Sequence, residues 1–157
     1  MRHLRRPFAH ATTLLLTMAL LGCSSLPPAG DYDAARANQL VAQAKALVGT
    51  PYRYGGDSPR GFDCSGFVQY THRKVGIDIP RTTRAQLKQS RTIKLARLQP
   101  GDLIFFRLSG RKISHVGIYI GNNRMIHAPS SGKRVAYASI DANSFWRSHI
   151  IAIGRFL

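Results

Sequence analysis

Two cysteines and six histidines are the side chains of this sequence best suited to nucleophilic and acid–base chemistry. Cys64 directly follows Asp63, a preferred N-cap residue, so we expect the cysteine in the first turn of a helix. Free backbone N–H groups and the positive end of the helix dipole favour a thiolate at that position. The pKa of Cys64 is therefore expected to fall below its ordinary value of about 8.5.

A cysteine nucleophile needs an imidazole partner, which also protonates the leaving amine. His72 lies at the far end of the same predicted helix, about 12 Å from the cysteine, and is expected on the surface. His149 begins the last predicted strand and has no local support. His115 and His127 each lie in an apolar strand, on either side of residues 121–123. Each alone would more commonly be a buried structural histidine, but together with a helix-capped cysteine they predict a catalytic site.

The two strand histidines can serve one site only if they point to the same face of the sheet. A two-residue loop between the strands would pair His127 with Ile118, which faces away from His115. A three-residue loop would instead pair His127 with Gly117, on the same face as His115. We therefore expect an odd-length loop with Asn123 near the left-handed region.

The elements that must position these residues follow from the hydrophobic pattern. Apolar residues at helical spacing come first, and runs typical of strands follow them. Helices are expected over residues 34–48, 64–75 and 83–89, and strands over residues 102–107, 113–120, 124–128, 134–139 and 149–156. Helices followed by antiparallel strands indicate an α+β domain.

The N-terminus indicates export. Three arginines precede a short apolar run over residues 14–21, which is the layout of a secretory signal peptide. Leu20-Leu21-Gly22-Cys23 resembles the lipobox of bacterial lipoproteins, which implies cleavage before Cys23 and lipidation of its thiol and new N-terminus, palmitate included. A plain signal peptide with an unrelated cysteine is the alternative. We expect a signal peptide at residues 1–22, a lipidated cysteine and tether at 23–35, and a catalytic domain at 36–157.

Lipidation of Cys23 would leave Cys64 without a disulfide partner in an oxidising compartment, where an unpaired thiol needs a function. Ser24 after the lipidated cysteine favours the outer membrane, so we expect a lipid anchor there, on the periplasmic face. The net charge of +16 first suggests a nucleic-acid partner. Export excludes that partner, and three arginines leave with the signal peptide. The remaining charge would attract carboxylates of the cell wall or an anionic membrane surface, or simply serve solubility.

Six ordered segments resemble the NlpC-type cell-wall endopeptidases, a papain-like group of cysteine peptidases, over roughly residues 36–157. They are Pro51-Tyr52 before Gly55-Gly56, Asp63-Cys64-Ser65-Gly66-Phe67-Val68, Pro80-Arg81-Thr82, Pro100-Gly101-Asp102-Leu103, His115-Val116-Gly117-Ile118-Tyr119 and His127-Ala128. The likeness extends to the small murein endopeptidase lipoproteins of Gram-negative bacteria. It implies a papain-like NlpC fold, with N-terminal helices packed on a five- to six-stranded antiparallel sheet.

The resemblance implies that Cys64 is the nucleophile, His115 the general base and acid, and His127 the residue that orients His115. It also places Tyr52 at the oxyanion, beside the Cys64 backbone N–H, although a packing aromatic is the alternative. Asp63, if it is more than a cap, would help to bind the substrate, and the neighbouring Ser65 is expected at the same place.

The implied reaction is hydrolysis of amide bonds in peptidoglycan stem peptides or crosslinks through a thioester on Cys64. The D-alanyl–diaminopimelate crosslink is favoured, and the D-glutamyl–diaminopimelate bond is the other possibility. No metal or cofactor is expected, since the chain has no Glu to act as a metalloprotease base. Peptidoglycan and the membrane are the expected partners, and a monomer is favoured. A non-catalytic envelope module that binds peptidoglycan or a partner protein is the alternative, and an amidase or acyltransferase remains open.

Overall fold

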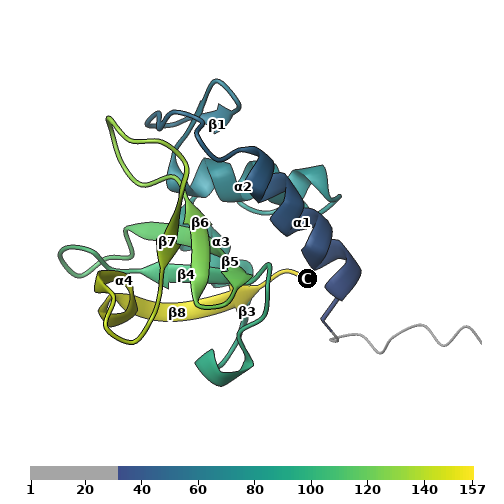
Figure 1. The fold of residues 1–157 in the computed structure, drawn as a ribbon, viewed down its shortest axis with the longest axis vertical. Helices are drawn as coiled ribbons and strands as arrows, with labels where there is room; N and C mark the ends of the chain where they lie inside the picture. The colour runs from purple at the N-terminus through teal and green to yellow at the C-terminus, as the bar shows by residue number, and fades with distance from the viewer. Residues whose placement is uncertain (1–31) are drawn as a thin grey trace, which may run out of the picture. The chain divides into compact units, whose positions relative to one another are not determined.

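The computed structural model describes residues 32–157, which form one α+β unit (Figure 1). The predicted signal peptide, the lipidation site Cys23 and most of the tether lie outside the described residues, so the expected domain boundaries stay predictions. No helix in residues 32–157 is long and apolar enough to cross a membrane.

The structure confirms the three predicted helices. They are α1 (Ala34–Ala46), α2 (Cys64–Lys74) and α3 (Thr83–Gln89). Each begins after a capping side chain: Asp33, Asp63 and Thr82 accept a hydrogen bond from the backbone N–H three residues further on. The caps satisfy N–H groups that the helix itself leaves free, so they define where each helix begins.

A six-stranded antiparallel sheet follows the helices, as predicted, in the order β3-β8-β4-β5-β6-β7. Its strands are β3 (Arg91–Thr92), β4 (Leu103–Phe106), β5 (His115–Gly121), β6 (Arg124–His127), β7 (Ala136–Ser139) and β8 (Ile150–Arg155). Five short elements were not predicted: the edge strand β3, β1 (Asp57–Ser58), β2 (Gly61–Phe62), the 3-10 turn η1 (Leu95–Arg97) and α4 (Phe145–Ser148). Elements this short bury too little for a sequence pattern to show them.

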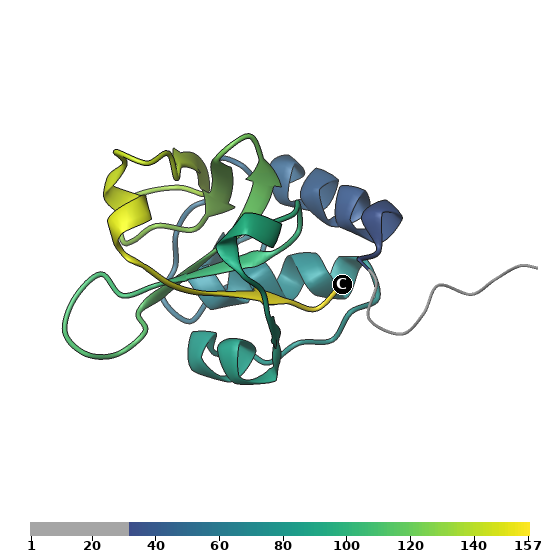
Figure 2. The same ribbon diagram turned by 90° about the horizontal axis from the view of Figure 1, so that it is seen from below.

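Both faces of the sheet are covered. Alternate residues of β4 point to opposite faces, and all four are buried. Leu103 and Phe105 join the cluster formed with α1 and α2, whereas Ile104 and Phe106 join a second cluster against which Trp146 of α4 packs. In both views of the ribbon, α1 and α4 therefore lie at opposite ends of the unit (Figures 1 and 2).

The β5–β6 hairpin brings the histidines to one face by a different route from the predicted one. The loop contains two residues, Asn122 and Asn123, with φ of 51° and 52°, which is the left-handed pair of a type I′ turn. Tyr119 pairs with Met125, but Gly121 pairs with Arg124, so one extra residue bulges out of β5. The prediction of a three-residue loop was therefore wrong, and the bulge in β5 supplies the extra residue instead.

His72 is not on the surface, contrary to the sequence prediction. Its side chain is fully buried in α2, where Nδ1 lies 2.9 Å from the carbonyl oxygen of Val68 and Nε2 has no partner among the described residues. The ring of Phe156 packs edge-on against it. Burial lowers the pKa of His72 to about 4, so the imidazole is neutral.

A buried ion pair ties the start of β4 to the end of β8. Arg155 donates from Nε to Asp102 Oδ1 at 2.6 Å and from Nη2 to Oδ2 at 2.8 Å. Asp102 is fully buried and also accepts a hydrogen bond from the Gln99 backbone N–H. The Pro100-Gly101-Asp102 segment of the motif therefore has a structural role, because Asp102 provides the carboxylate of this ion pair.

Candidate active site

Cys64 is the first residue of α2, as predicted, and its side chain is partly buried. The Asp63 carboxylate caps the helix by accepting a 2.7 Å hydrogen bond from the Gly66 backbone N–H. A side chain at Gly66 would collide with the carbonyl oxygen of Gly56, so the glycine allows the preceding loop to close over the first turn. This packing holds the thiol at the helix N-terminus.

The sulfur of Cys64 lies between α3 and β5. Its side-chain hydrogen bond in the described residues is to Thr83 Oγ1, at 3.8 Å, rather than to His115. Cys64 also packs against the buried cluster that contains Val116. Since Val116 directly follows His115, these contacts place the thiol against the beginning of the strand that carries the histidine.

The pKa of Cys64 is raised, and the prediction of a lowered value was wrong. Burial of the thiol raises the pKa most, and the Asp63 carboxylate raises it further. Hydrogen bonds from Thr83 and from the backbone lower it, as the helix-terminus argument required, but they do not offset the desolvation. The resting nucleophile is therefore a neutral thiol at pH 7.

His115 and His127 lie together on one face, as predicted. His115 Nε2 is 2.8 Å from His127 Nδ1, and the two side chains are 2% and 4% exposed. The register places Gly117 opposite His127, and a Cβ atom on Gly117 would be 3.3 Å from the His127 Cβ. A glycine here leaves room for the two rings to meet.

Both imidazoles are held neutral. Burial, and then the neighbouring His127, lower the pKa of His115 to about 3. Burial, and then the charge of Lys133, lower the pKa of His127 to about 4. A neutral imidazole can accept the proton of a neutral thiol, and hydrogen bonds between catalytic groups commonly tighten only in the substrate complex.

Trp146 covers the histidine pair and was missed in the sequence. Its ring centroid lies 4.6 Å from that of His127 and 5.3 Å from that of His115. It comes from α4, a helix of four residues. No periodicity marks so short a helix, so only the three-dimensional packing identifies this tryptophan as part of the site.

Asp63 and Ser65 lie together, and both accept hydrogen bonds from a third residue, Arg81. Arg81 donates to both carboxylate oxygens of Asp63, at 2.9 and 2.6 Å, and to Ser65 Oγ at 3.0 Å. Burial would raise the pKa of Asp63, but the hydrogen bonds from Arg81 and from the Gly66 N–H lower it. The sequence showed Arg81 only as part of a motif; its bidentate pairing needs the fold.

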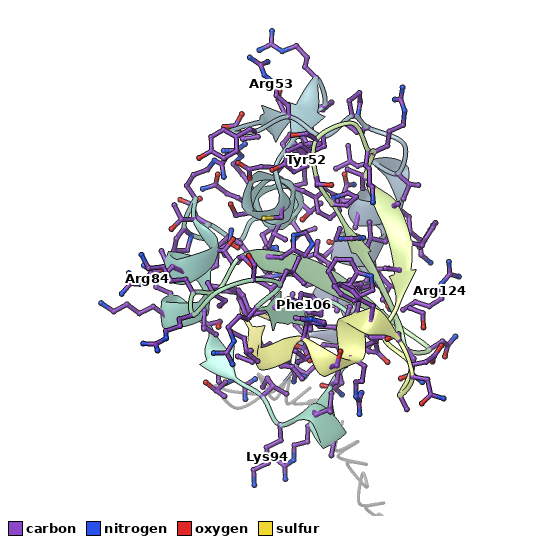
Figure 3. The ribbon with its side chains drawn as sticks, turned by 90° about the vertical axis from the view of Figure 1, so that its left-hand side faces the viewer. Tyr52, Arg53, Arg84, Lys94, Phe106 and Arg124 are labelled. Carbon is purple, nitrogen blue, oxygen red and sulfur yellow. The ribbon has the colours of Figure 1, made fainter. Side chains whose placement is uncertain are left out.

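Tyr52 lies near the thiol. It forms a bridge with Phe62, its backbone N–H donates to the Lys133 carbonyl, and its side chain is half-buried. Burial, and then the charges of Cys64 and Asp63, raise the pKa of its hydroxyl, which is therefore protonated and able to donate. Figure 3 shows Tyr52 beside α2, which is seen end-on in that view.

Metal-binding clusters are not found in this part of the molecule: no group of three or more His, Cys or Asp side chains within residues 32–157 could hold an ion.

Comparison with known proteins places this site in a family. The family model described as the NlpC/P60 family matches residues 49–155. The chain is 40% identical over 125 residues to the murein DD-endopeptidase MepH of Escherichia coli (strain K12), covering 76% of this chain and 44% of that protein. It is 47% identical over 111 residues to the probable endopeptidase NlpC homolog of Haemophilus influenzae, covering 70% of this chain and 58% of that protein.

Solved structures agree with this match. An NlpC/P60 family protein from Bacillus cereus superposes with a TM-score of 0.73 at 33% identity, covering 77% of this chain and 40% of that one. The present chain thus spans less than two thirds of each of these three proteins.

Proposed function

Since this chain belongs to the NlpC/P60 family, we propose that it is a peptidoglycan endopeptidase with Cys64 as its nucleophile. The observation that carries the proposal is the thiol at the N-terminus of α2, which packs against β5, the strand that begins with His115, while His115 itself contacts His127 of β6. The name of MepH, a murein DD-endopeptidase, supports peptidoglycan as the substrate.

The first step moves one proton and forms one bond. The thiol proton of Cys64 passes to Nδ1 of His115, while Sγ attacks the carbonyl carbon of the scissile amide. The tetrahedral intermediate then collapses, the C–N bond breaks, and His115 returns the proton to the leaving amine. Water hydrolyses the resulting thioester, with His115 again acting as base, and the free thiol is restored.

The histidine pair fixes which nitrogen does this work. His115 Nε2 is engaged with His127 Nδ1, so Nδ1 is the nitrogen of His115 that remains for the thiol. Base chemistry at Nδ1 requires the proton to sit on Nε2, which then donates to an unprotonated Nδ1 of His127. His127 thereby orients the ring and supports the imidazolium that forms during the reaction.

Oxyanion stabilisation is proposed for two donors. The backbone N–H of Cys64 lies in the first turn of α2, where N–H groups lack intrahelical acceptors. The Tyr52 hydroxyl is protonated, and the charge of Cys64 is among the causes that raise its pKa. Donors fixed before the reaction stabilise developing negative charge most effectively. Asp63 and Ser65 would contribute to substrate binding through the hydrogen-bonded cluster that they form with Arg81.

Bond choice and location complete the proposal. The D-alanyl–diaminopimelate crosslink is the preferred bond, in line with the name of MepH. The lipobox at Cys23 supports anchoring to the outer membrane on the periplasmic face. We also propose that the protein is a monomer. Incorporation of labelled palmitate that is lost in Cys23→Ala, together with fractionation of membranes, tests the anchor.

Digestion of purified sacculi tests the activity. The wild-type protein is expected to release soluble fragments, and Cys64→Ala and His115→Ala are expected to release none. His149→Asn is a matched control, since His149 lies outside the site and an amide still provides a donor for the Phe145 carbonyl. Mass analysis of the fragments identifies the bond. Equal release by the wild type and Cys64→Ala would refute the proposal, and sacculus binding without any release would indicate a binding module instead.

A further inference from the structure

A groove of about 360 Å³ lies between α3, the β4–β5 loop of residues 107–114 and β8. Its lining combines two kinds of side chain, apolar and cationic. These are Leu87, Ile113 and Ile151, and Arg84, Arg111 and Lys112. The three cations are exposed, whereas Leu87 and Ile113 are partly buried against the main core. The groove thus offers apolar surface next to three positive charges.

Within residues 32–157, no carboxylate neutralises the positive charge of the groove, since none is among the side chains that line it. The salt bridges found within residues 32–157 use Arg36, Arg81 and Arg155, so none of the three groove cations is paired there. An anionic ligand would therefore meet cations whose charge no neighbouring carboxylate offsets.

The groove adjoins the candidate active site on two walls. Arg84 directly follows Thr83, whose hydroxyl oxygen is 3.8 Å from the sulfur of Cys64. Ile113 lies two residues before His115 at the start of β5. The loop between Arg107 and Ser114 is closed at its base by a hydrogen bond from the Ser114 N–H to the Phe106 carbonyl. One wall of the groove therefore begins at a residue that contacts the thiol, and the other continues into the strand that begins with His115.

We propose that this groove binds a carboxylate-bearing stem peptide of peptidoglycan next to the scissile bond. The inference rests on the proposed function. A stem peptide carries free carboxylates and the small methyl side chains of alanine, so the cations would take its carboxylates and the apolar residues its methyl groups. The groove would then set the preference among stem peptides by charge, independently of the chemistry at Cys64.

Steady-state cleavage of two soluble crosslinked muropeptides tests this proposal, one with free carboxylates and one with those carboxylates amidated. For Arg111→Gln/Lys112→Gln, KM for the free-carboxylate substrate is expected to rise about tenfold, the effect of two exposed ion pairs. The kcat is expected to stay unchanged, because both residues lie outside the reacting groups. KM for the amidated substrate is expected to stay the same.

Lys94→Gln/Arg124→Gln is the matched control, with the same loss of charge away from the groove. Figure 3 shows Arg124 on the opposite side of the molecule from Arg84, and Lys94 at the lower end. An equal rise of KM in both double variants would show only general charge attraction and overturn the proposal. Equal effects on the free and amidated substrates would also overturn it.

Binding measurements separate this inference from the activity itself. Anisotropy of a labelled free-carboxylate muropeptide is measured with the Cys64→Ala protein, with and without the groove substitutions. Should the wild type cleave nothing, the proposed activity fails, yet weaker binding on substitution of Arg111 and Lys112 would still support the groove. Unchanged muropeptide binding, together with weaker binding to phosphatidylglycerol vesicles, would make the groove a membrane contact and overturn the inference.

Discussion

His115 Nε2 lies 2.8 Å from His127 Nδ1, although twelve positions of sequence and a β-bulge separate the two residues. This contact uses one nitrogen of the His115 ring and leaves the other for the Cys64 thiol. Because the two rings are almost fully buried, water does not compete for the hydrogen bond. This hydrogen bond therefore helps to orient the base in the proposed reaction.

Removal of the second imidazole tests that dependence. His127→Ala is expected to lower kcat on a crosslinked muropeptide by about 10²-fold, since the His115 ring would lose its fixed tautomer and orientation. His127→Asn is expected to retain more activity, because its amide oxygen can still accept from Nε2–H. Alanine and asparagine variants with equal, near wild-type kcat would contradict the orienting role.

Trp146→Ala is expected to raise the pKa of both histidines toward the ordinary value of about 6.5. Burial is the main cause of the lowered values, and the tryptophan ring covers both imidazoles. NMR titration of the ring C–H resonances measures the shift, and Trp146→Phe serves as the control that keeps an aromatic cover. Histidine pKa values that stay near 3 and 4 in Trp146→Ala would show that other residues exclude the water.

Thr83→Val tests whether the hydroxyl tunes the nucleophile. The Thr83 hydrogen bond lowers the pKa of Cys64, so its loss is expected to slow alkylation by iodoacetamide at neutral pH about fivefold, the equivalent of a hydrogen bond of about 1 kcal/mol. Thr83→Ser is expected to restore the rate, whereas the exposed Thr92→Val should leave it unchanged. A valine variant that reacts as fast as the wild type would exclude this role.

The lowered pKa of the buried His72 predicts that the fold loses stability at acid pH. Its folded-state pKa of about 4 lies below the unfolded value of about 6.5, so the unfolded chain binds the extra proton between these values. The stability due to neutral His72 is complete above pH 6.5 and is lost as the pH falls toward 4, by about 3 kcal/mol. Urea unfolding of the wild type and His72→Asn at pH 7 and 4.5 measures it. Parallel losses in the two proteins would assign the effect to other groups.

Asp102→Asn is expected to destabilise the fold by about 3–5 kcal/mol, because it leaves the Arg155 guanidinium buried without its anion. Chemical unfolding measures the cost. The double change Asp102→Leu/Arg155→Leu removes both charges and is expected to recover much of the lost stability. A double variant less stable than Asp102→Asn would show that the pair contributes more than mutual neutralisation.

Local signals explain which parts of the structure could be predicted. The three helices followed from helical periodicity and from caps such as Asp63, and α3 was predicted at its observed bounds. The strands were predicted one or two residues too long at several ends, because the sequence pattern does not show where the pairing between strands stops. The bulge in β5 was not predicted, since a single extra residue leaves no periodic signal.

The sequence by itself determined that Cys64 would begin a helix and that His115 and His127 would flank one turn, because capping and strand alternation act over a few residues. Only the tertiary structure decided the protonation of these groups. The thiol pKa is raised and the imidazole pKa values are lowered because segments far apart in the chain exclude water from these groups. Trp146, for example, covers both imidazoles. Desolvation depends on what surrounds a group in space, and no local pattern encodes it.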